Sequence, residues 1–425
     1  MDCPRVLLVG ATPYNPCNQG RSLDSYFHFF PKECLHQIFS NSPTPVKGLC
    51  DELYQITDKR LAKARFEKTN RSGRLFRYED CTENNPKLTV TRKPPFLKGT
   101  GIFGLARKMV WRKKYWCTPE LEKWVADFAP EIIFVYAGED HFQFDIAEHF
   151  SKKLGIPIIV SIVDDIYFKN HFSLSPFWAI YKSGIRRRIR AFMKLDVIGS
   201  FCSDKIRDRY CGFFKIKGFT SYISTPGHES DADLPLPEKI ENAYYFGNLE
   251  YGRWEALNDI AKAFLSKDSA VKVHVYTSNY AIVENKKRPS NLLLHRPIPY
   301  NDVLSLTSNA DLLLIAESNK PKFMKEVAYS LSTKVGDSFS FLRPLLCYAG
   351  SETGVASFLK DNGGAVLATT KDELQRAVSD IVDGKIDFDT LRKKEKEIYD
   401  ECFSLDKQAA LFKQRVIAFL SEREK

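Results

Sequence analysis

Residues 311–318 read DLLLIAES and residues 331–350 read LSTKVGDSFSFLRPLLCYAG. The first stretch is an apolar run, suited to a buried strand, that ends in the polar pair Glu317 and Ser318. The second opens a helix near Lys334 and returns to an apolar run after Pro344. A strand, a helix and a second strand in this order predict a βαβ unit with parallel strands.

The same alternation extends in both directions from this unit. After it, residues 354–367, GVASFLKDNGGAVL, predict a helix and a short strand, and another helix begins near Lys371. Before it, strands and helices are expected at 243–246, 254–265, 271–276, 292–295 and 301–308. These elements predict a doubly wound α/β domain over residues 240–405. Residues 406–425 predict a terminal helix that packs back on the domain junction.

Residues 1–225 show the same pattern and predict an N-terminal domain of the same class. Strands are expected at 5–9, 132–136, 158–163 and 197–200, and helices at 118–128 and 144–154. Residues 224–239, STPGHESDADLPLPEK, combine Pro, Gly and acidic residues without periodicity, as a linker does. Parallel sheets bind ligands beyond the carboxyl ends of their strands, so two such domains would enclose a donor and an acceptor.

The composition indicates a folded protein without a membrane span. The 425 residues are 44% hydrophobic and 27% charged, enough to bury two cores, and no low-complexity tract is present. No run of about 18 apolar residues occurs, and the apolar start lacks the cleavage site of a signal peptide. The ten cysteines are scattered without zinc-ligand spacing, which favours reduced thiols and a cytoplasmic protein.

The second half of the chain resembles glycosyltransferase family 4. The matching residues follow the family's order and spacing, and they are Glu317, Ser332, Thr333, Lys334, Asp337 and Pro344. The resemblance covers residues 243–385 well and the first domain only in outline. It implies the GT-B fold, in which two Rossmann-like domains face each other across a cleft. It also implies a nucleoside diphosphate sugar as donor, and retention of configuration at the transferred sugar.

Elementary chemistry agrees with the phosphate site that this resemblance implies. Ser332 and Thr333 stand where a helix begins, so unpaired backbone N–H groups would face a diphosphate. Lys334 would add a positive charge to the same phosphates. Asp337, one turn further, would bind the ribose hydroxyls, although relatives usually have Glu there. An ordinary helix cap is the alternative interpretation of Ser332 and Thr333.

Two further charged residues are assigned to the donor. Arg253, in YFGNLEYGRWEAL (245–257), begins a helix, where a cation opposes the helix dipole unless an anion is bound. The similar family segment holds a basic residue that meets the diphosphate. Glu317 ends a buried strand and would act as a catalytic and donor-binding residue by holding sugar hydroxyls. The alternative is a surface carboxylate beside Lys320 and Lys322.

The first domain offers less explicit candidates. Gly20, in the loop after the first strand, would let the ligand approach the backbone, although the loop is also interpretable as a simple turn. The loop lacks GxGxxG, which argues against a dinucleotide-dependent oxidoreductase. Asp164 and Asp165 follow a buried strand, and either would act as the catalytic base on the acceptor unless it only caps a helix. Val163 stands where many relatives have histidine, so no histidine role is implied.

Asp140 and His141 form another polar strand end at the same crevice, where a structural role is the alternative for His141. The adjacent pair Asp164 and Asp165 lacks the intervening residue of the DxD metal motif. We therefore expect no obligatory metal and no cofactor.

Two basic stretches of the sequence indicate which kinds of partner the protein binds. Residues 102–114 combine apolar residues at helical spacing with five cations, and residues 182–194 hold six more. An anionic membrane surface is one expected partner, and a solvated basic helix packed on the domain is the alternative. Nucleic acid is not expected, because no recognised binding module accompanies the charges.

The sequence therefore predicts a glycosyltransferase of the EC 2.4 class that carries out hexosyl or related transfer. It would move a sugar from a nucleoside diphosphate sugar to a hydroxyl of a glycan or lipid-linked saccharide. Bacterial surface polysaccharide biosynthesis is the expected setting, in the cytoplasm or peripherally at the inner face of the plasma membrane. Two alternatives stay open: a nucleotide-sugar epimerase or hydrolase, and a GT-B protein that binds a nucleotide sugar or a partner without catalysis.

Overall fold

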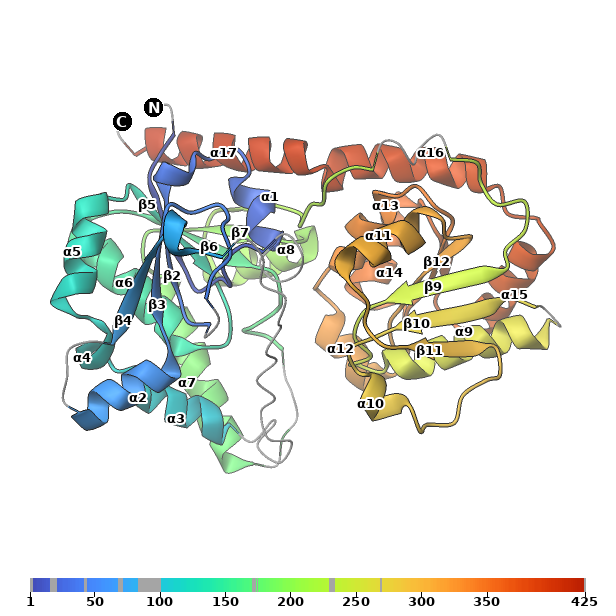
Figure 1. The fold of residues 1–425 in the computed structure, drawn as a ribbon, viewed down its shortest axis with the longest axis horizontal. Coiled ribbons are helices and arrows are strands. Elements are labelled where there is room, and N and C mark those ends of the chain that lie inside the picture. The colour runs from blue at the N-terminus through green and yellow to red at the C-terminus, as the bar shows by residue number, and fades with distance from the viewer. Residues whose placement is uncertain are drawn as a thin grey trace. The chain divides into compact units, whose positions relative to one another are not determined.

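The computed structural model of the chain describes residues 3–15, 21–41, 44–67, 72–82, 101–169, 173, 175–228, 234–267 and 270–423. Two compact units divide the chain, and each is an α/β domain built on its own sheet (Figure 1). The first unit contains Met1–Ser221 and Ala409–Lys425, and the second contains Tyr222–Gln408.

The first unit is built on an eight-stranded sheet in the order β4-β3-β2-β1-β5-β6-β7-β8. Neighbouring strands are parallel except β3 and β4, which pair antiparallel at one edge. The strands are β1 Val6–Val9, β2 Leu35–Phe39, β3 Glu52–Ile56, β4 Gly73–Arg77, β5 Ile132–Tyr136, β6 Ile158–Ile162, β7 Val197–Phe201 and β8 Gly218–Thr220. β1 and β6 are buried along their whole length, as expected of parallel strands with helices on both faces.

Helices connect these strands and cover the sheet. In α5, Thr118 caps the first turn by accepting a hydrogen bond from Leu121 N, and Pro119 takes the first helical position. Its buried residues recur at helical spacing: Leu121, Trp124, Val125 and Phe128. The helices of this unit are α1 Asp24–Phe27, α2 Asp58–Glu67, α3 Ile102–Val110, α4 Lys113–Trp116, α5 Pro119–Phe128, α6 His141–Leu154, α7 Pro176–Phe192 and α8 Asp204–Phe214.

The C-terminal helix α17, Leu405–Ser421, starts in the second unit, and its later turns belong to the first. Phe412 on this helix is fully buried against the rings of Tyr26, Phe27 and Phe134, at centroid distances of 5.0, 5.5 and 5.8 Å. Figure 1 shows α17 beside α1, which carries two of these rings. Edge-to-face aromatic packing of this kind attaches the C-terminal helix to the first core.

The second unit is built on a six-stranded parallel sheet in the order β11-β10-β9-β12-β13-β14. This is the Rossmann strand order, and the order reverses between β9 and β12. The strands are β9 Asn242–Phe246, β10 Lys272–Tyr276, β11 Leu292–His295, β12 Leu312–Ala316, β13 Leu345–Tyr348 and β14 Val366–Ala368. The helices are α9 Arg253–Ser266, α10 Tyr280–Val283, α11 Tyr300–Ser308, α12 Pro321–Val327, α13 Thr333–Phe339, α14 Gly354–Asn362, α15 Lys371–Val382 and α16 Phe388–Ile398.

The predicted α/β class with two parallel sheets is confirmed, and the predicted strands are present with ends shifted by at most about one residue. Four strands of the first unit, β2, β3, β4 and β8, were not predicted from the sequence. In β2 and β3 the apolar runs are broken by buried polar residues. Gln37 donates to Ala11 O at 2.9 Å, and Gln55 donates to Asn41 O at 2.7 Å. These bonds let buried amides sit inside strands, a compensation that periodicity does not reveal.

Two further expectations from the sequence, that no helix spans a membrane and that the cysteines are reduced, can be compared with the described residues. Among them, no helix has both the length and the apolar character needed to cross a membrane. The nine cysteines that the structure describes are free thiols. Cys17 lies outside the described residues.

We expect Phe412→Ala to lower the free energy of unfolding of the first unit by about 3–5 kcal/mol, because it leaves a cavity in an aromatic core. Denaturant unfolding followed by tryptophan fluorescence reports on this unit, since four of the chain's five tryptophans lie in it. Gln414→Ala, at an exposed position of the same helix, is the matched control and should change stability by less than about 0.5 kcal/mol. Equal midpoints for the two variants would contradict this packing.

Candidate functional site

The candidate site of the second unit lies where the strand order of its sheet reverses. β9 ends at Phe246, and the loop after it leads to Arg253, the first residue of α9. β12, the neighbouring strand, ends at Ala316 and is followed by Glu317. Ligands of such sheets bind beyond the carboxyl ends of the strands at this point.

Arg253 and Glu317 form a buried bidentate ion pair. Arg253 Nε donates to Glu317 Oε2 at 2.9 Å, and Nη2 donates to Oε1 at 2.8 Å. Arg253 Nη1 donates to Asn248 Oδ1 at 2.6 Å, in the loop after β9. Glu317 is 2% exposed and Arg253 is 8% exposed. Burial alone would lower the pKa of Arg253, but the charge and hydrogen bonds of Glu317 raise that pKa above its ordinary value.

Two glycines let the loop after β9 approach its neighbours. Gly247 has a φ of +149°, and a Cβ there would lie 2.5 Å from Lys334 Cε. Gly252 has a φ of +78°, and a Cβ there would lie 2.6 Å from Ser318 Oγ. A side chain at Gly252 would therefore push the loop away from the end of β12, and one at Gly247 would displace the Lys334 side chain.

Lys334 lies next to this loop, at the start of α13. Ser332 Oγ accepts a hydrogen bond from Lys334 N at 3.4 Å and caps the helix. The side chain of Lys334 passes Gly247, and its Nζ lies 5.9 Å from the centre of the Tyr245 ring. No described residue forms a hydrogen bond or ion pair with Lys334 Nζ.

The electrostatics of Lys334 follow from this position. Burial lowers the pKa of Lys334 to about 8, and the charge of Arg253 adds to the effect, while Glu317 and Asp337 oppose it. Glu317 already holds Arg253 with both oxygens. The site therefore contains a half-buried lysine whose charge is not met by a close carboxylate.

The other predicted donor residues lie along α13. Ser332 is its N-cap, Thr333 is its first residue and is exposed, and Asp337 follows one turn later, half-buried. The structure thus brings Arg253, Glu317 and Lys334 together in space. The other three predicted residues are within three positions of Lys334 in the sequence. The assignment of Ser332, Thr333 and Asp337 to the diphosphate and ribose stays a prediction.

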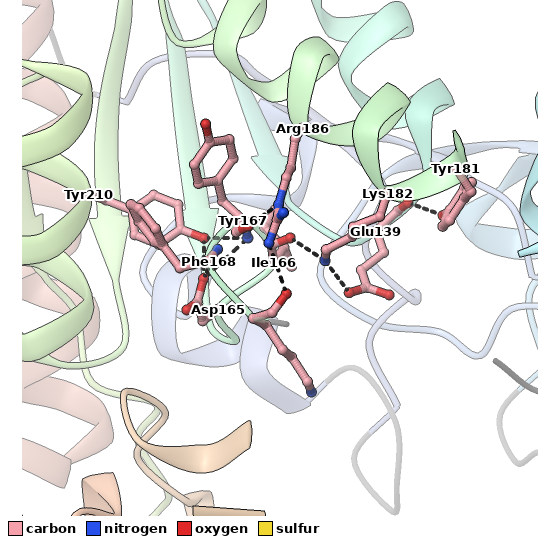
Figure 2. Close-up of polar contacts among 10 residues, drawn as sticks. Glu139, Asp165, Ile166, Tyr167, Phe168, Tyr181, Lys182, Arg186 and Tyr210 are labelled. Carbon is pink, nitrogen blue, oxygen red and sulfur yellow. Dashed lines mark hydrogen bonds and ion pairs between the residues drawn. The ribbon is translucent and has the colours of Figure 1, made fainter. Parts of the chain in front are cut away.

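In the first unit, Asp165 holds the loop that follows β6 (Figure 2). Its Oδ1 accepts hydrogen bonds from Tyr167 N at 3.2 Å, Phe168 N at 2.8 Å and Tyr210 OH at 2.9 Å. Asp165 is 6% exposed. With these three donors on one oxygen, the geometry favours a structural role for Asp165.

Asp164, one residue earlier, is exposed at the end of β6. Burial raises the pKa of Tyr136, at the end of β5, to about 12, and the charge of Asp164 contributes to that rise. The Asp164 carboxylate therefore lies near the ends of two neighbouring strands. Of the two predicted acceptor-side aspartates, Asp164 is the exposed one, and its role as a base stays a prediction. Gly20 lies outside the described residues.

Helix α7 holds the loops after β5 and β6 through its basic side chains, as Figure 2 shows. Lys182 is buried, and its Nζ donates to Ile166 O at 3.0 Å and pairs with Glu139 Oε1 at 3.2 Å. Arg186 Nε donates to Tyr167 O at 2.8 Å. These cations therefore satisfy loop carbonyl groups inside the unit.

Two further basic residues of α7 are also engaged within the unit. Arg188 pairs with Asp145 at 2.5 Å and with Glu148 at 2.6 Å. Arg190 donates to the hydroxyl of Tyr167. The basic stretch 182–194 is thus largely a structural feature, whereas sequence analysis linked it to an external anionic surface. Single-sequence charge counting could not show which cations have internal partners.

Asp140 and His141, at the start of α6, are also engaged in the fold. Asp140 forms an ion pair with Arg107. His141 is 6% exposed, and burial lowers its pKa to about 4, with Lys108 and Arg188 adding to the shift. His141 is therefore neutral at physiological pH, which fits the structural alternative better than acid–base chemistry.

No protein-family model and no curated protein matches the chain. Solved structures match nearly its whole length at low identity. Sucrose-phosphate synthase from Thermosynechococcus elongatus has a TM-score of 0.59 at 9% identity, over 98% of this chain and 99% of that chain. Anabaena HepE in complex with UDP has a TM-score of 0.59 at 11% identity, over 98% and 100%. The α,α-trehalose 6-phosphate synthase from Burkholderia multivorans has a TM-score of 0.59 at 9% identity, over 99% and 97%.

These proteins are glycosyltransferases of the GT-B fold. Their likeness extends over 98% of the chain and therefore over both units. The protein therefore has the GT-B fold, as the sequence resemblance implied.

We expect Glu317→Gln to lower the free energy of unfolding of the second unit by about 3–5 kcal/mol, because it leaves the buried Arg253 charge uncompensated. Replacing both partners with Met should recover most of this loss, since no buried charge then remains. Urea unfolding followed by circular dichroism measures both effects, with the exposed Glu352→Gln as control. A cost below about 1 kcal/mol for Glu317→Gln would contradict a closely coupled buried pair.

Proposed function

We propose that the protein is a glycosyltransferase whose nucleoside diphosphate sugar donor binds the second unit at the ends of β9 and β12 and the start of α13. The observation that carries the proposal is Lys334. It is a half-buried cation without a close counter-ion, at the position of a Rossmann-type sheet where ligands bind. An anionic diphosphate would supply the missing charge.

The neighbouring residues support this assignment. Arg253 is held by Glu317 and Asn248, so its charge is fixed in place before a ligand arrives. Preorganised cations stabilise the negative charge that develops on a departing diphosphate. In this proposal Lys334 and Arg253 provide that stabilisation without an obligatory metal, and Ser332 and Thr333 add backbone N–H groups.

Glu317 has two roles in the proposed mechanism. Each carboxylate oxygen accepts one hydrogen bond from Arg253, which leaves further lone pairs on both. These lone pairs can accept hydrogen bonds from donor-sugar hydroxyls, while the same carboxylate orients Arg253. Asp337 would hold the ribose one helical turn beyond Lys334.

The solved structures add support for the donor class. HepE, which shares this fold, has been determined with UDP, with UDP-glucose, and with UDP and glucose. Three kinds of observation thus support a nucleotide sugar as the donor: the sequence resemblance, the fold and the cationic site.

For the acceptor we propose a hydroxyl of a glycan or lipid-linked saccharide, activated by Asp164 in the first unit. Bacterial surface polysaccharide assembly at the inner face of the membrane is the setting we favour. In support, large apolar side chains are exposed on two helices in contact, at Ile102, Phe103 and Met109 of α3 and Phe177 and Ile180 of α7. Such side chains, with Lys108 and Arg187 exposed on the same helices, suit an anionic membrane surface.

We expect the affinity for the nucleoside diphosphate to fall about tenfold between pH 7 and pH 9. Lys334 carries a lowered pKa of about 8 in the free protein, and a bound anion raises it, so binding above pH 8 requires proton uptake. Calorimetric titration of UDP, GDP, ADP and dTDP at several pH values selects the ligand and measures the slope.

Lys334→Met should weaken binding at pH 7 by about tenfold or more and abolish the pH dependence. Lys320→Met, at an exposed lysine after β12, is the matched control and should leave both unchanged. A Lys334→Met variant that binds the nucleoside diphosphate as tightly as the wild type at pH 7 would exclude Lys334 from the phosphate site.

We expect Asp164→Asn to lower turnover by about 100-fold or more while donor affinity stays unchanged, because it removes the proposed base. Release of nucleoside diphosphate in the presence of an acceptor panel, with product analysis, measures transfer and separates it from hydrolysis or epimerisation. Asp165→Asn should instead lower stability, because three donors lose their charged acceptor. Full turnover in Asp164→Asn would refute the assigned role. Donor binding without turnover in the wild type would favour the non-catalytic alternative, to which Val163 at the histidine position points.

A further inference from the structure

Three metal-ligating side chains meet on the outer helices of the first unit. Cys117 lies between α4 and α5, Glu122 lies in the first turn of α5, and His149 lies in α6. Cys117 Sγ is 3.2 Å from His149 Nε2, which is 2.9 Å from Glu122 Oε1, and the sulfur is 3.4 Å from the same oxygen. His149 lies about 12 Å along α6 from the strand ends where the acceptor residues lie, so this cluster is separate from them.

The distances suit a tetrahedral metal ion. Zinc with one sulfur, one nitrogen and one oxygen ligand holds those atoms about 3.4–3.6 Å from one another. Each pair in the cluster would need to open by about half an ångström or less to reach that geometry. We propose that Cys117, Glu122 and His149 bind a divalent metal ion of the zinc class, with a fourth coordination position left to an exogenous ligand.

The chemistry of the three ligands favours zinc over calcium or magnesium. Thiolate and imidazole are ligands of zinc and other transition metals, whereas calcium and magnesium require oxygen. A thiolate and a carboxylate together balance the two positive charges of the ion. Lys153, which pairs with Glu122 Oε1 at 3.0 Å, competes for that oxygen, and the carboxylate has a second oxygen to offer it.

The surrounding structure holds the ligands close to their binding positions. Trp116, the residue before Cys117, is 1% exposed, and Thr118, the residue after it, caps α5. The His149 ring lies edge-on to Trp116, with centroids 5.6 Å apart. The thiol and the imidazole are therefore positioned by buried neighbours, so metal binding orders few additional groups.

A cavity of about 660 Å³ borders the cluster and indicates the fourth ligand. Its charged lining has five cations and two carboxylates, namely Lys108, Arg112, Lys113, Lys152, Lys153, Asp145 and Glu148. Lys152 and Lys153 pair with Glu148 and Glu122, which leaves the other three cations in excess. Trp116 also lines the cavity, and its Nε1–H is buried without an acceptor among the described residues. Excess cations and an unused N–H donor attract an anion, so in this proposal the fourth ligand is an anion such as phosphate.

The test uses the full-length protein, stripped with a chelator and dialysed to equilibrium against micromolar ZnCl₂. Metal analysis should find one zinc ion per wild-type chain bound at this site. Cys117→Ser, Glu122→Gln and His149→Gln should each weaken zinc binding at least about tenfold, as loss of a ligand requires. Cys211→Ser, at a half-buried thiol of the same unit, is the control and should keep wild-type binding. A wild-type protein without bound zinc, or zinc binding that all three variants retain, overturns the proposal.

Cobalt substitution tests the wild-type protein directly, without relying on the folding of variants. The Co²⁺-loaded protein should show a thiolate-to-cobalt charge-transfer band, and its visible spectrum should change when inorganic phosphate is added. Absence of the charge-transfer band overturns the metal site. A spectrum that phosphate leaves unchanged overturns the anion at the fourth position. None of these readouts depends on transferase activity, so the outcome is distinct from that of the proposed function.

Discussion

The ion pair between Arg253 and Glu317 is the constraint on which the second unit's site depends. Neither charge can be buried alone, so the loop after β9 and the end of β12 must meet. Asn248 and the positive-φ glycines Gly247 and Gly252 shape the loop to allow this. Once the loop is in place, the side chain of Lys334 passes Gly247 and lies half-buried, without a counter-ion of its own. The cationic site therefore follows from the ion pair for two reasons. Both carboxylate oxygens of Glu317 already bind Arg253, and the pair holds the loop next to Lys334.

The first unit uses buried charge in a related way, with a different result. Asp165 gathers the loop after β6 around one oxygen, and Lys182 and Arg186 satisfy the carbonyl groups of the same loop from α7. Each of these three charged side chains therefore already has hydrogen-bond partners inside the unit. Asp164, one residue before Asp165, is exposed at the strand end. In the second unit, by contrast, the cation Lys334 has no close counter-ion. This difference matches the ligands proposed for the two units, an anionic diphosphate for the second and an acceptor hydroxyl for the first.

Much of the fold could be predicted from the sequence, because parallel strands buried on both faces are apolar runs of recognisable length. β5 and β11 have the ends that the apolar pattern predicts, whereas β2 and β3 contain buried glutamines that break the pattern. Arg253 and Glu317 were both singled out as candidate site residues, but sequence alone could not show that they bind each other across 64 positions. The internal role of the α7 cations was missed for the same reason. The cluster of Cys117, Glu122 and His149 has no linear motif, because its ligands meet only after α5 packs against α6.

A crystal structure of the protein with the nucleoside diphosphate that it binds would show directly whether Lys334 and Arg253 hold the phosphates. We expect phosphate oxygens within hydrogen-bonding distance of Lys334 Nζ, with Arg253 still held by Glu317 and contributing its charge to the same group. A diphosphate bound elsewhere in the second unit, with Lys334 Nζ still without a partner, would refute this assignment.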